Sequence, residues 1–341
     1  MKQYRIKLVV VCLLFISLFS ACEKEELNNE IINTHSTIIE KFGKGRFDNI
    51  PFKWDYTLIP VISDGLFIGD QFISVDNRYI VTPPPIYLGA SYVSKNFGNI
   101  FKPEIVFPRN PIDVVFNFTI PFVGRINNEF GSKWYRKLLV DALDSKQYKY
   151  NIDNKILNYD IKLVEAYSYS DIEKAFPKSK GALGKNLLME VKKLSKLKDV
   201  QSILIGQLSC KNFTVYMDFA VKGFFKDKMN NNNLNNPVYL QSITYGKCAF
   251  FVIESRYSYK EIKDIVLSRF SLANTVDIEK EILNNSTITL FVVSNNFQIA
   301  KVKTSMEDLD MFLHETFDEY SYGYPIYCQG AFTKDNTLFK E

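Results

Sequence analysis

Residues 237–255 read P-V-Y-L-Q-S-I-T-Y-G-K-C-A-F-F-V-I-E-S, and this stretch decides the fold class of the chain. It alternates in the manner of a β-strand, is interrupted by Tyr245-Gly246-Lys247, and then resumes. A glycine inside a strand weakens pairing and often marks a bulge or a close approach of another backbone. We therefore predict a long buried strand in which Tyr245, Gly246 and Lys247 mark the point where the sheet bends, with a simple bulge in a static sheet as the alternative.

Other strands and helices are expected around this segment. Alternating or apolar stretches predict strands at residues 112–121, 159–168, 201–207, 213–221, 287–294 and 325–332. Helical spacing of apolar residues is found at residues 134–143 and 304–320, where Ser305 is a suitable N-cap with Asp308 at the capping-box position. Long strands with segregated helices predict an α+β fold.

The segment 180–199 satisfies two periods at once. As a helix it places Leu187, Leu188, Val191 and Leu194 on one face. As a strand, in which alternate residues share a face, it places Leu183, Leu187, Met189, Val191 and Leu197 on one parity, that is, on one face. Lys185, Lys193 and Leu194 are exceptions to this alternation. The residues alone leave two interpretations open. The segment is either an ordinary amphipathic helix or a helix that refolds into a membrane hairpin.

The segment 259–278 behaves in the same way. Its helical stripe consists of Ile262, Ile265, Val266 and Phe270. Its strand parity consists of Ile262, Val266, Phe270, Leu272, Val276 and Ile278, with Ile265 and Leu267 as exceptions. A transmembrane β-strand needs roughly 9–11 residues with alternating faces, so each segment is long enough for one hairpin.

The N-terminus carries a targeting signal. Lys2, Arg5 and Lys7 precede a short apolar run from Leu8 to Leu18. The following F-S-A-C, ending at Cys22, resembles the lipobox of bacterial lipoproteins. The resemblance implies a signal peptide over residues 1–21 and acylation of Cys22, the alternative being ordinary secretion with Cys22 incidental.

The residues after Cys22 are strongly polar. The acidic E-K-E-E that follows is similar to the surface-export tag of lipoproteins from the Bacteroidetes group. Residues 22–50 are expected to be a lipidated tether and residues 51–341 the folded core. The expected location is the bacterial outer membrane, lipid-anchored and surface-exposed, or released from it.

Composition excludes several classes of function. The signal segment holds three of the 42 bases and no acid, so a processed chain has 39 bases against 38 acids and no reason to bind nucleic acid. The chain has two histidines, His35 and His314, and no C-x-x-C, H-E-x-x-H, G-x-S-x-G, P-loop or dinucleotide motif. We expect no enzyme, no metal and no cofactor. Cys210, Cys248 and Cys328 lie in apolar contexts that favour buried thiols.

Five motifs, in order, are similar to those of the thiol-activated, cholesterol-dependent cytolysins of the MACPF/CDC superfamily. Tyr245-Gly246-Lys247 resembles the family's Y-G-R strand element, with lysine in place of arginine. The other four are I-Y-L-G-A at 86–90, N-P-I-D-V at 110–114 with I-P-F-V-G at 120–124, P-I-Y at 325–327, and F-T-K-D-N at 332–336. The resemblance runs from Ile86 to Asn336.

This resemblance implies a bent antiparallel sheet flanked by two helical clusters that unfurl into transmembrane hairpins when subunits assemble. The two segments with a double period fall where those clusters are expected. The family's paired glycines correspond to Ser294 and Asn295, which become the hinge candidates. No counterpart of the family's terminal β-sandwich is expected before the chain ends at Glu341, so cholesterol binding does not carry over.

The sequence therefore predicts a short pore-forming component that meets the membrane through its lipid. It is expected to form homo- or hetero-oligomers, the latter with a longer cytolysin-like subunit. The alternative is a non-lytic immunity or decoy lipoprotein that keeps the core fold and binds a related toxin. Retention of Tyr245 and Gly246 favours the pore, whereas Ser294 and Asn295 favour the alternative.

Overall fold

The computed structural model describes the chain from residue 44 onward, with gaps. The described residues are 44–58, 65–75, 78–81, 86–97, 107–127, 131–176, 182–195, 197–218, 222–226, 236–271, 277–294 and 301–340. Every structural statement below concerns these residues. The predicted signal segment, Cys22, Leu272, Val276 and Asn295 lie outside them.

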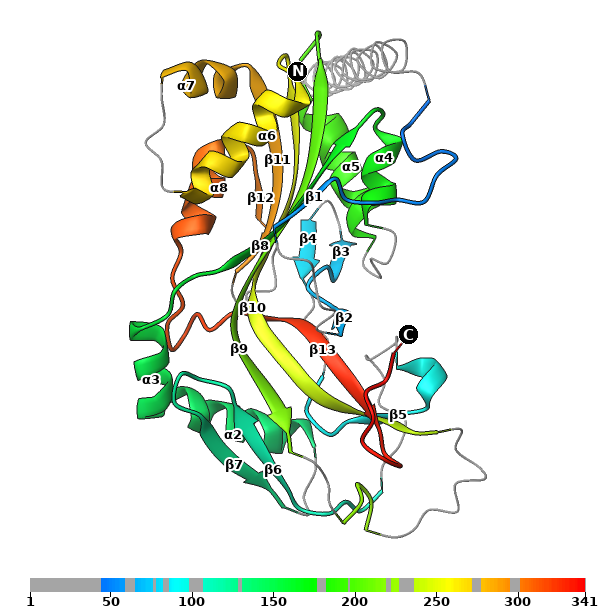
Figure 1. Ribbon diagram of the computed structural model, residues 1–341, viewed down its shortest axis with the longest axis vertical. Coiled ribbons are helices and arrows are strands. Elements are labelled where there is room, and N and C mark those ends of the chain that lie inside the picture. The colour runs from blue at the N-terminus through cyan, green and yellow to red at the C-terminus, as the bar shows by residue number, and fades with distance from the viewer. Residues whose placement is uncertain are drawn as a thin grey trace, which may run out of the picture.

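The described chain is elongated and is built around a strongly bent antiparallel sheet with helices on both sides (Figure 1). Its strands are β1 (Tyr56–Thr57), β2 (Leu66–Phe67), β3 (Phe72–Val75), β4 (Arg78–Val81), β5 (Ser91–Tyr92), β6 (Ile112–Phe116), β7 (Phe122–Ile126), β8 (Tyr159–Ala166), β9 (Ser202–Met217), β10 (Val238–Ser255), β11 (Ser286–Val293), β12 (Lys301–Lys303) and β13 (Tyr324–Phe332). Its helices are α2 (Ser132–Leu143), α3 (Lys146–Asp153), α4 (Ser170–Ala175), α5 (Leu183–Leu194), α6 (Tyr259–Ser268), α7 (Asp277–Asn284) and α8 (Met306–His314), with 3-10 turns η1 (Ser94–Asn96) and η3 (Arg269–Ser271).

Eleven of the described strands form one sheet, and β3 and β4 form a separate hairpin. The main path runs β1-β8-β9-β10-β11-β12, and every described pairing is antiparallel. In its lower half β10 pairs with β13 and β5 rather than with β11, and β9 pairs with β6 rather than with β8. The two longest strands, β9 and β10, therefore run through both halves of the molecule and join them (Figure 1). The predicted α+β class is confirmed.

The strand predicted at 237–255 is present as β10, which is buried along almost its whole length. The two strands predicted at 201–207 and 213–221 are one strand, β9. The separation of the two predicted strands was wrong, because the intervening residues 208–212 continue the same strand. Asn212 and its polar neighbours are instead accommodated inside a continuous strand.

Both segments with a double period begin as helices. The first becomes α5, and the second becomes α6 followed by the turn η3. The helix predicted at 304–320 is α8, which is shorter than expected because it ends at His314. Ser305 is its N-cap as predicted, since its hydroxyl accepts a hydrogen bond from the N–H of Asp308 at 3.2 Å.

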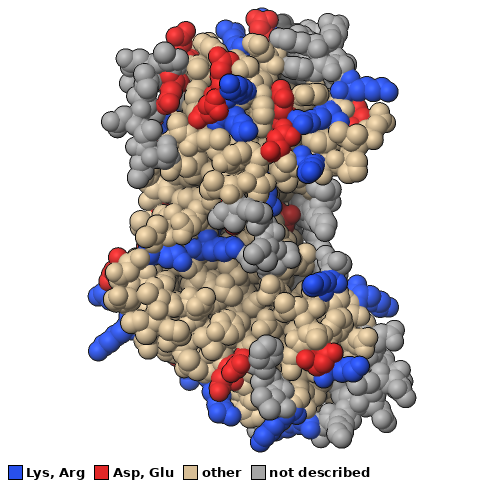
Figure 2. All heavy atoms as spheres, viewed as in Figure 1, with Lys and Arg blue, Asp and Glu red and all other residues tan. Residues whose placement is uncertain are grey.

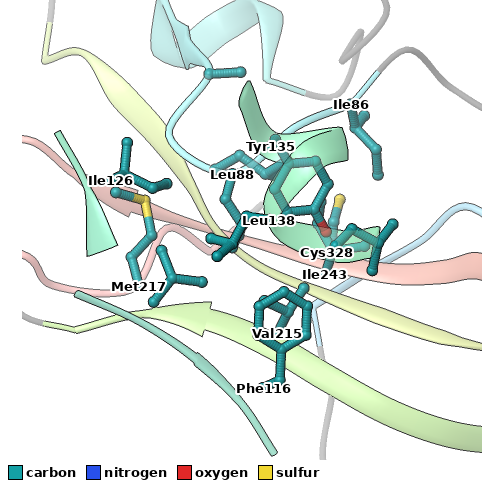
Figure 3. Packing of buried hydrophobic residues seen from close by; sticks show 14 of the residues in the cluster. Ile86, Leu88, Phe116, Ile126, Tyr135, Leu138, Val215, Met217, Ile243 and Cys328 are labelled. Carbon is teal, nitrogen blue, oxygen red and sulfur yellow. The ribbon is translucent and has the colours of Figure 1, made fainter. Parts of the chain in front are cut away.

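The lower half has its own hydrophobic core. Helix α2 contributes Tyr135 and Leu138, which pack against Phe116 of β6, Val215 of β9 and Ile243 of β10 (Figure 3). These side chains come from elements far apart in the sequence. Their burial fixes α2 and the β6–β7 hairpin against the lower ends of the two long strands.

The upper half has a hydrophobic core on each face of the sheet. Phe250 of β10 packs in one core with Leu187 of α5, whereas its neighbour Phe251 packs in the other with Ile262 of α6. Successive strand residues point to opposite faces, so one strand serves both cores. Helices α4 and α5 cover one face and α6, α7 and α8 the other (Figure 1). The predicted arrangement of a bent sheet between two helical clusters is confirmed.

Neither a surface of one charge sign on the face shown in Figure 2 nor a membrane-spanning helix is found in the described residues. On the face shown in Figure 2, basic and acidic side chains are intermixed over the upper half, so no large field of one sign forms there. Within the described ranges, no helix has the length and apolar character needed to cross a bilayer.

Candidate functional site

Two register shifts of the sheet meet at Tyr245 and Gly246, the residues at which the sequence predicts a bend. Against β9, Tyr245 pairs with Phe213 and Gly246 with Lys211, so Asn212 is an extra residue. Against β13, Thr244 pairs with Tyr327 and Tyr245 with Pro325, so Ile326 is also extra. Both neighbours of β10 therefore bulge at the same rung, and a bulge increases local bending and twist. At this rung the extra residues lie in the flanking strands, whereas lower down β10 has an extra residue of its own, Gln241, against β13.

Space, rather than an unusual torsion, explains the glycine at position 246. A Cβ atom added to Gly246 would lie 2.2 Å from the carbonyl oxygen of Cys210 and 2.8 Å from Cδ1 of Ile326. Gly246 does not belong to the glycines with positive φ, whereas Gly323 does, with φ at 98°. A Cβ on Gly323 would in turn lie 2.5 Å from the carbonyl oxygen of Gly246. The missing side chain at Gly246 thus leaves room for the backbone of β9 at Cys210, and the missing side chain at Gly323 lets that residue lie against the backbone of Gly246.

Tyr245 joins the bend to the lower half. Its ring stacks on Phe213 with centroids 5.0 Å apart, and its hydroxyl lies 2.9 Å from the hydroxyl of Tyr135 on α2. Burial raises the pKa of both phenols well above the ordinary value. Both groups are therefore neutral, and their hydroxyls satisfy one another inside the core.

Lys247 joins the bend to α8. It is 1% exposed, and its Nζ donates to the carbonyl oxygen of Phe312 at 2.5 Å and to that of Glu315. The ammonium also lies 4.8 Å from the ring centroid of Phe312 and 5.4 Å from that of Tyr159. These carbonyls belong to the C-terminal end of α8, where positive charge is favourable. Burial lowers the pKa of Lys247 to about 8.

The first helical cluster, defined as α4 and α5, contains most of the first set of hairpin candidates. Leu183, Leu187 and Val191 are completely buried against the sheet, whereas Met189 is 49% exposed and Leu197 is half-buried after the helix. The structure therefore brings together four of the five predicted residues on the sheet side. Met189 is the apolar member that faces solvent.

A buried carboxyl that the sequence analysis did not single out joins this cluster to β10. Glu254 accepts hydrogen bonds from the hydroxyls of Tyr169, at the start of α4, and Ser195, at the end of α5. Burial raises the pKa of Glu254 to about 7. Glu254 is the penultimate residue of β10. A signal was present in the sequence, because the three preceding positions of the same parity, Cys248, Phe250 and Val252, are apolar.

The second helical cluster, defined as α6, η3 and α7, holds the other candidates. Ile262 and Val266 are buried on the sheet, and Phe270 packs at the edge of the same core with its ring 5.9 Å from that of Tyr159. Ile278 lies in α7. The N-terminus of α6 has a complete capping box between Ser258 and Glu261.

The hinge candidates are only partly visible. Ser294 follows directly after the last residue of β11 and is half-buried. It lies between that strand and a segment outside the described residues, which includes Asn295. The role of these two positions stays a prediction.

The described residues offer little for catalysis. Among them, no group of three or more histidine, cysteine, aspartate or glutamate side chains is placed to hold a metal ion. Cys210, Cys248 and Cys328 are buried, and burial raises the pKa of the Cys210 thiol to about 11 and that of the Cys248 thiol well above its ordinary value. The Cys210 and Cys248 thiols are therefore protonated and unsuited to nucleophilic chemistry.

Comparisons with known proteins identify the architecture. No protein-family model and no curated protein sequence matches the chain. Its fold matches the crystal structures of wild-type pneumolysin (TM-score 0.56, 17% identity, 80% of this chain and 61% of that one) and suilysin from Streptococcus suis (TM-score 0.55, 16% identity, 81% and 67%). It also matches the human-specific toxin intermedilysin (TM-score 0.56, 17% identity, 79% and 60%).

These matches are similarities of fold at low sequence identity. The chain spans about three fifths of the length of pneumolysin and of intermedilysin. Suilysin is described as a cytotoxin protein and intermedilysin as a human-specific toxin.

Proposed function

We propose that this chain, whose fold is that of the cholesterol-dependent cytolysins, is a component of an oligomeric membrane pore. One observation carries the proposal. The two amphipathic segments that also alternate with strand parity pack as helical clusters on opposite faces of the same stretch of sheet, α5 on one face and α6 on the other. Both can extend the strands to which they are attached.

The chemistry of a bilayer explains why refolding requires assembly. A single hairpin in hydrocarbon leaves backbone N–H and C=O groups unpaired at its edges, which costs several kcal/mol per group. A closed ring of hairpins pairs all of them. In the soluble form, Leu183, Leu187 and Val191 are kept from water by the sheet, so these three members of the apolar parity are covered until subunits meet, whereas Met189 is exposed.

Attachment to the membrane is assigned to the lipid on Cys22, with residues 22–50 as tether and residues 51–341 as the pore-forming core. The last residues of that tether, around Phe47, are docked on the core. The anchored protein is placed at the outer-membrane surface. Recognition of the target membrane is assigned to a longer cytolysin-like subunit in a mixed ring.

The parity of α5 provides the test. Met189 is exposed in the soluble helix but belongs to the parity assigned to lipid, so Met189→Lys should leave folding intact and abolish leakage. A lysine on the lipid face of a barrel costs about 2–4 kcal/mol at the bilayer centre. Lys192→Glu, on the opposite parity of the same helix, is the matched control and should leave leakage unchanged.

The measurement is dye release from phosphatidylethanolamine–phosphatidylglycerol vesicles and from phosphatidylcholine–cholesterol vesicles. Each variant is assayed alone and together with a longer cytolysin-like chain. Equal leakage by the Met189→Lys and Lys192→Glu proteins would sink the hairpin assignment. A thermal melt of each variant excludes misfolding as the cause of a loss.

A second candidate function is a non-lytic immunity or decoy protein that caps the ring of a related toxin. Its support is Ser294, a residue other than glycine at the end of β11, where the related toxins are expected to need a flexible hinge. In that case the wild-type protein would not leak vesicles under any condition. It would instead reduce leakage caused by the longer chain in proportion to its concentration.

A further inference from the structure

The segment 44–58, called the strap below, lies along the outer edge of β8. Its residues Tyr56 and Thr57 form β1 and pair with Leu163 and Lys162. At the two ends of this short ladder, the N–H of Asp55 donates to the carbonyl oxygen of Leu163 and the N–H of Leu58 to that of Ile161, both at 3.0 Å. The strap is thus the terminal strand of the main sheet path.

Two side chains of the strap form hydrogen bonds with the backbone of the next outward-facing residue of β8. Arg46 and Asp55 form a two-point ion pair, with both N–O distances at 2.8 Å. From this pair, Asp55 accepts a hydrogen bond from the N–H of Glu165 at 3.4 Å, and Arg46 donates to the carbonyl oxygen of Glu165 at 3.5 Å. The outward backbone groups at residues 161, 163 and 165 are therefore all engaged. An exposed ion pair adds little stability, so its importance here lies in covering the strand edge.

The strap is docked on the first helical cluster. The fully buried carboxylate of Asp171 on α4 accepts hydrogen bonds from the N–H groups of Arg46 at 3.0 Å and Phe47 at 3.3 Å. Asp48 of the strap forms an ion pair with Lys174 of the same helix.

An aromatic series continues this contact. Phe47 packs on Phe52 with ring centroids 4.6 Å apart, Phe52 on Trp54 at 5.1 Å, and Trp54 on Phe176 at the end of α4 at 5.9 Å. Phe47 is buried in the core that α5 shares with the sheet. Moving the strap therefore removes part of the covering of the first helical cluster.

The strap also reaches the second helical cluster on the opposite face. Tyr56 packs at the margin of the core that contains α6, and Nζ of Lys263 on α6 lies 4.9 Å from the centroid of its ring. One segment of fifteen residues thus contacts the free edge of the sheet and one helical cluster on each face.

We infer that the strap is an autoinhibitory element that closes the β8 edge to a strand from a second subunit and holds both helical clusters on the sheet. The inference rests on the proposed function for its biological meaning. A strand edge adds another chain only when its outward N–H and C=O groups are unpaired. Displacement of the strap frees those groups and removes contacts from both clusters together.

A reversible covalent lock tests this inference. Thr57 and Lys162 are directly opposite and accessible, and antiparallel partners have Cα separations of roughly 4.5–5.5 Å, which suits a disulfide. The lock is Thr57→Cys with Lys162→Cys. The matched control is Asp113→Cys with Arg125→Cys, a directly opposite pair on β6 and β7 in the lower half. The three native cysteines of the described chain are buried and do not compete.

The readouts are detergent-resistant oligomers and dye release on the two vesicle types, with and without the longer chain. We expect both to be lost when the strap is oxidised onto β8 and to return on reduction with dithiothreitol. The control lock should have no effect in either state. Oligomers and leakage at equal rates in the locked and reduced forms would overturn the inference while leaving the pore function standing.

A second measurement separates the inference from the proposed function. Arg46→Ala with Asp55→Ala loosens the strap, and Asp113→Ala with Arg125→Ala removes an exposed ion pair in the lower half as control. Hydrogen exchange should become faster in β8, α4 and α6 of the first variant alone. If none of the proteins releases dye from vesicles but this exchange pattern is found, the proposed pore function is wrong, while the inference that the strap holds both helical clusters stands. Faster exchange confined to residues 44–58 would refute the inference that the strap holds the helical clusters on the sheet.

Discussion

The hydroxyl of Tyr169 lies 2.5 Å from Oε1 of Glu254 and donates a hydrogen bond to it where neither side chain is more than 3% exposed. Ser195 donates to the same oxygen at 2.9 Å. Tyr169 begins α4 and Ser195 follows α5, so one carboxyl on β10 fastens both ends of the first helical cluster to the sheet. Because this contact is titratable, the stability of the cluster depends on pH.

The free energy of unfolding should fall as pH rises from about 4.5 to about 7. Burial raises the pKa of Glu254 to about 7 in the folded chain from an ordinary value of 4.5, so the folded state binds more protons across this window. At 1.36 kcal/mol per pH unit, the contribution is about 3 kcal/mol. Urea titrations at pH 4.5 and 8 measure it.

The same titrations on Glu254→Gln should show a smaller difference between the two pH values, because glutamine cannot ionise. Glu307→Gln, at an exposed position of α8, is the control and should retain the wild-type difference. A Glu254→Gln protein with an unchanged pH dependence would assign the effect to other groups.

Gly246→Ala should destabilise the protein by more than about 2 kcal/mol. The new Cβ would overlap the carbonyl oxygen of Cys210, a backbone atom that cannot move without disturbing β9. Gly131→Ala is the control, since nothing lies within 4 Å of its added Cβ and only a cap loss of up to about 1 kcal/mol is expected. Chemical denaturation compares them, and similar losses for both would contradict the steric argument.

Lys247→Met should loosen the end of α8. The methionine has a similar shape but leaves the carbonyls of Phe312 and Glu315 without the ammonium donor, at a cost of about 1–3 kcal/mol. Hydrogen exchange across residues 306–317 should accelerate. Tyr159→Phe, which removes the hydroxyl that donates to the carbonyl oxygens of Leu313 at 2.6 Å and Phe312 at 3.4 Å, should have a smaller effect at the same residues. The reverse order would show that Tyr159 is the principal tether.

Leu187→Ala should lower the free energy of unfolding by about 2–5 kcal/mol, because Leu187 is fully buried between α5 and the sheet. Met189→Ala, two residues away on the solvent side of the same helix, should change it by no more than about 0.5 kcal/mol. Thermal and urea unfolding distinguish the two. Equal losses would mean that α5 does not pack on the sheet through its Leu187 face.

The sequence predicted the long strand, the amphipathic helices and the N-cap at Ser305, because each depends on residues close together in the chain. The continuity of β9 was missed because Asn212 is a polar residue whose side-chain amide is satisfied by distant groups, the hydroxyl of Tyr148 and the carbonyl of Tyr322. The strap was missed for a related reason. A two-residue ladder between Tyr56 and Leu163 has no periodicity, and its partners are about a hundred residues apart.

The extra residues Asn212 and Ile326 have a consequence for the shape of the sheet. Both lie opposite the same part of β10, next to Tyr245, whereas β10 carries an extra residue of its own, Gln241, lower down against β13. Above Tyr245 the ladders of β10 with β9 and with β11 continue without a shift in register. The upper half, which holds both helical clusters, is therefore a regular ladder in which each side chain keeps its face, and the irregular pairing begins at Tyr245 and lies below it.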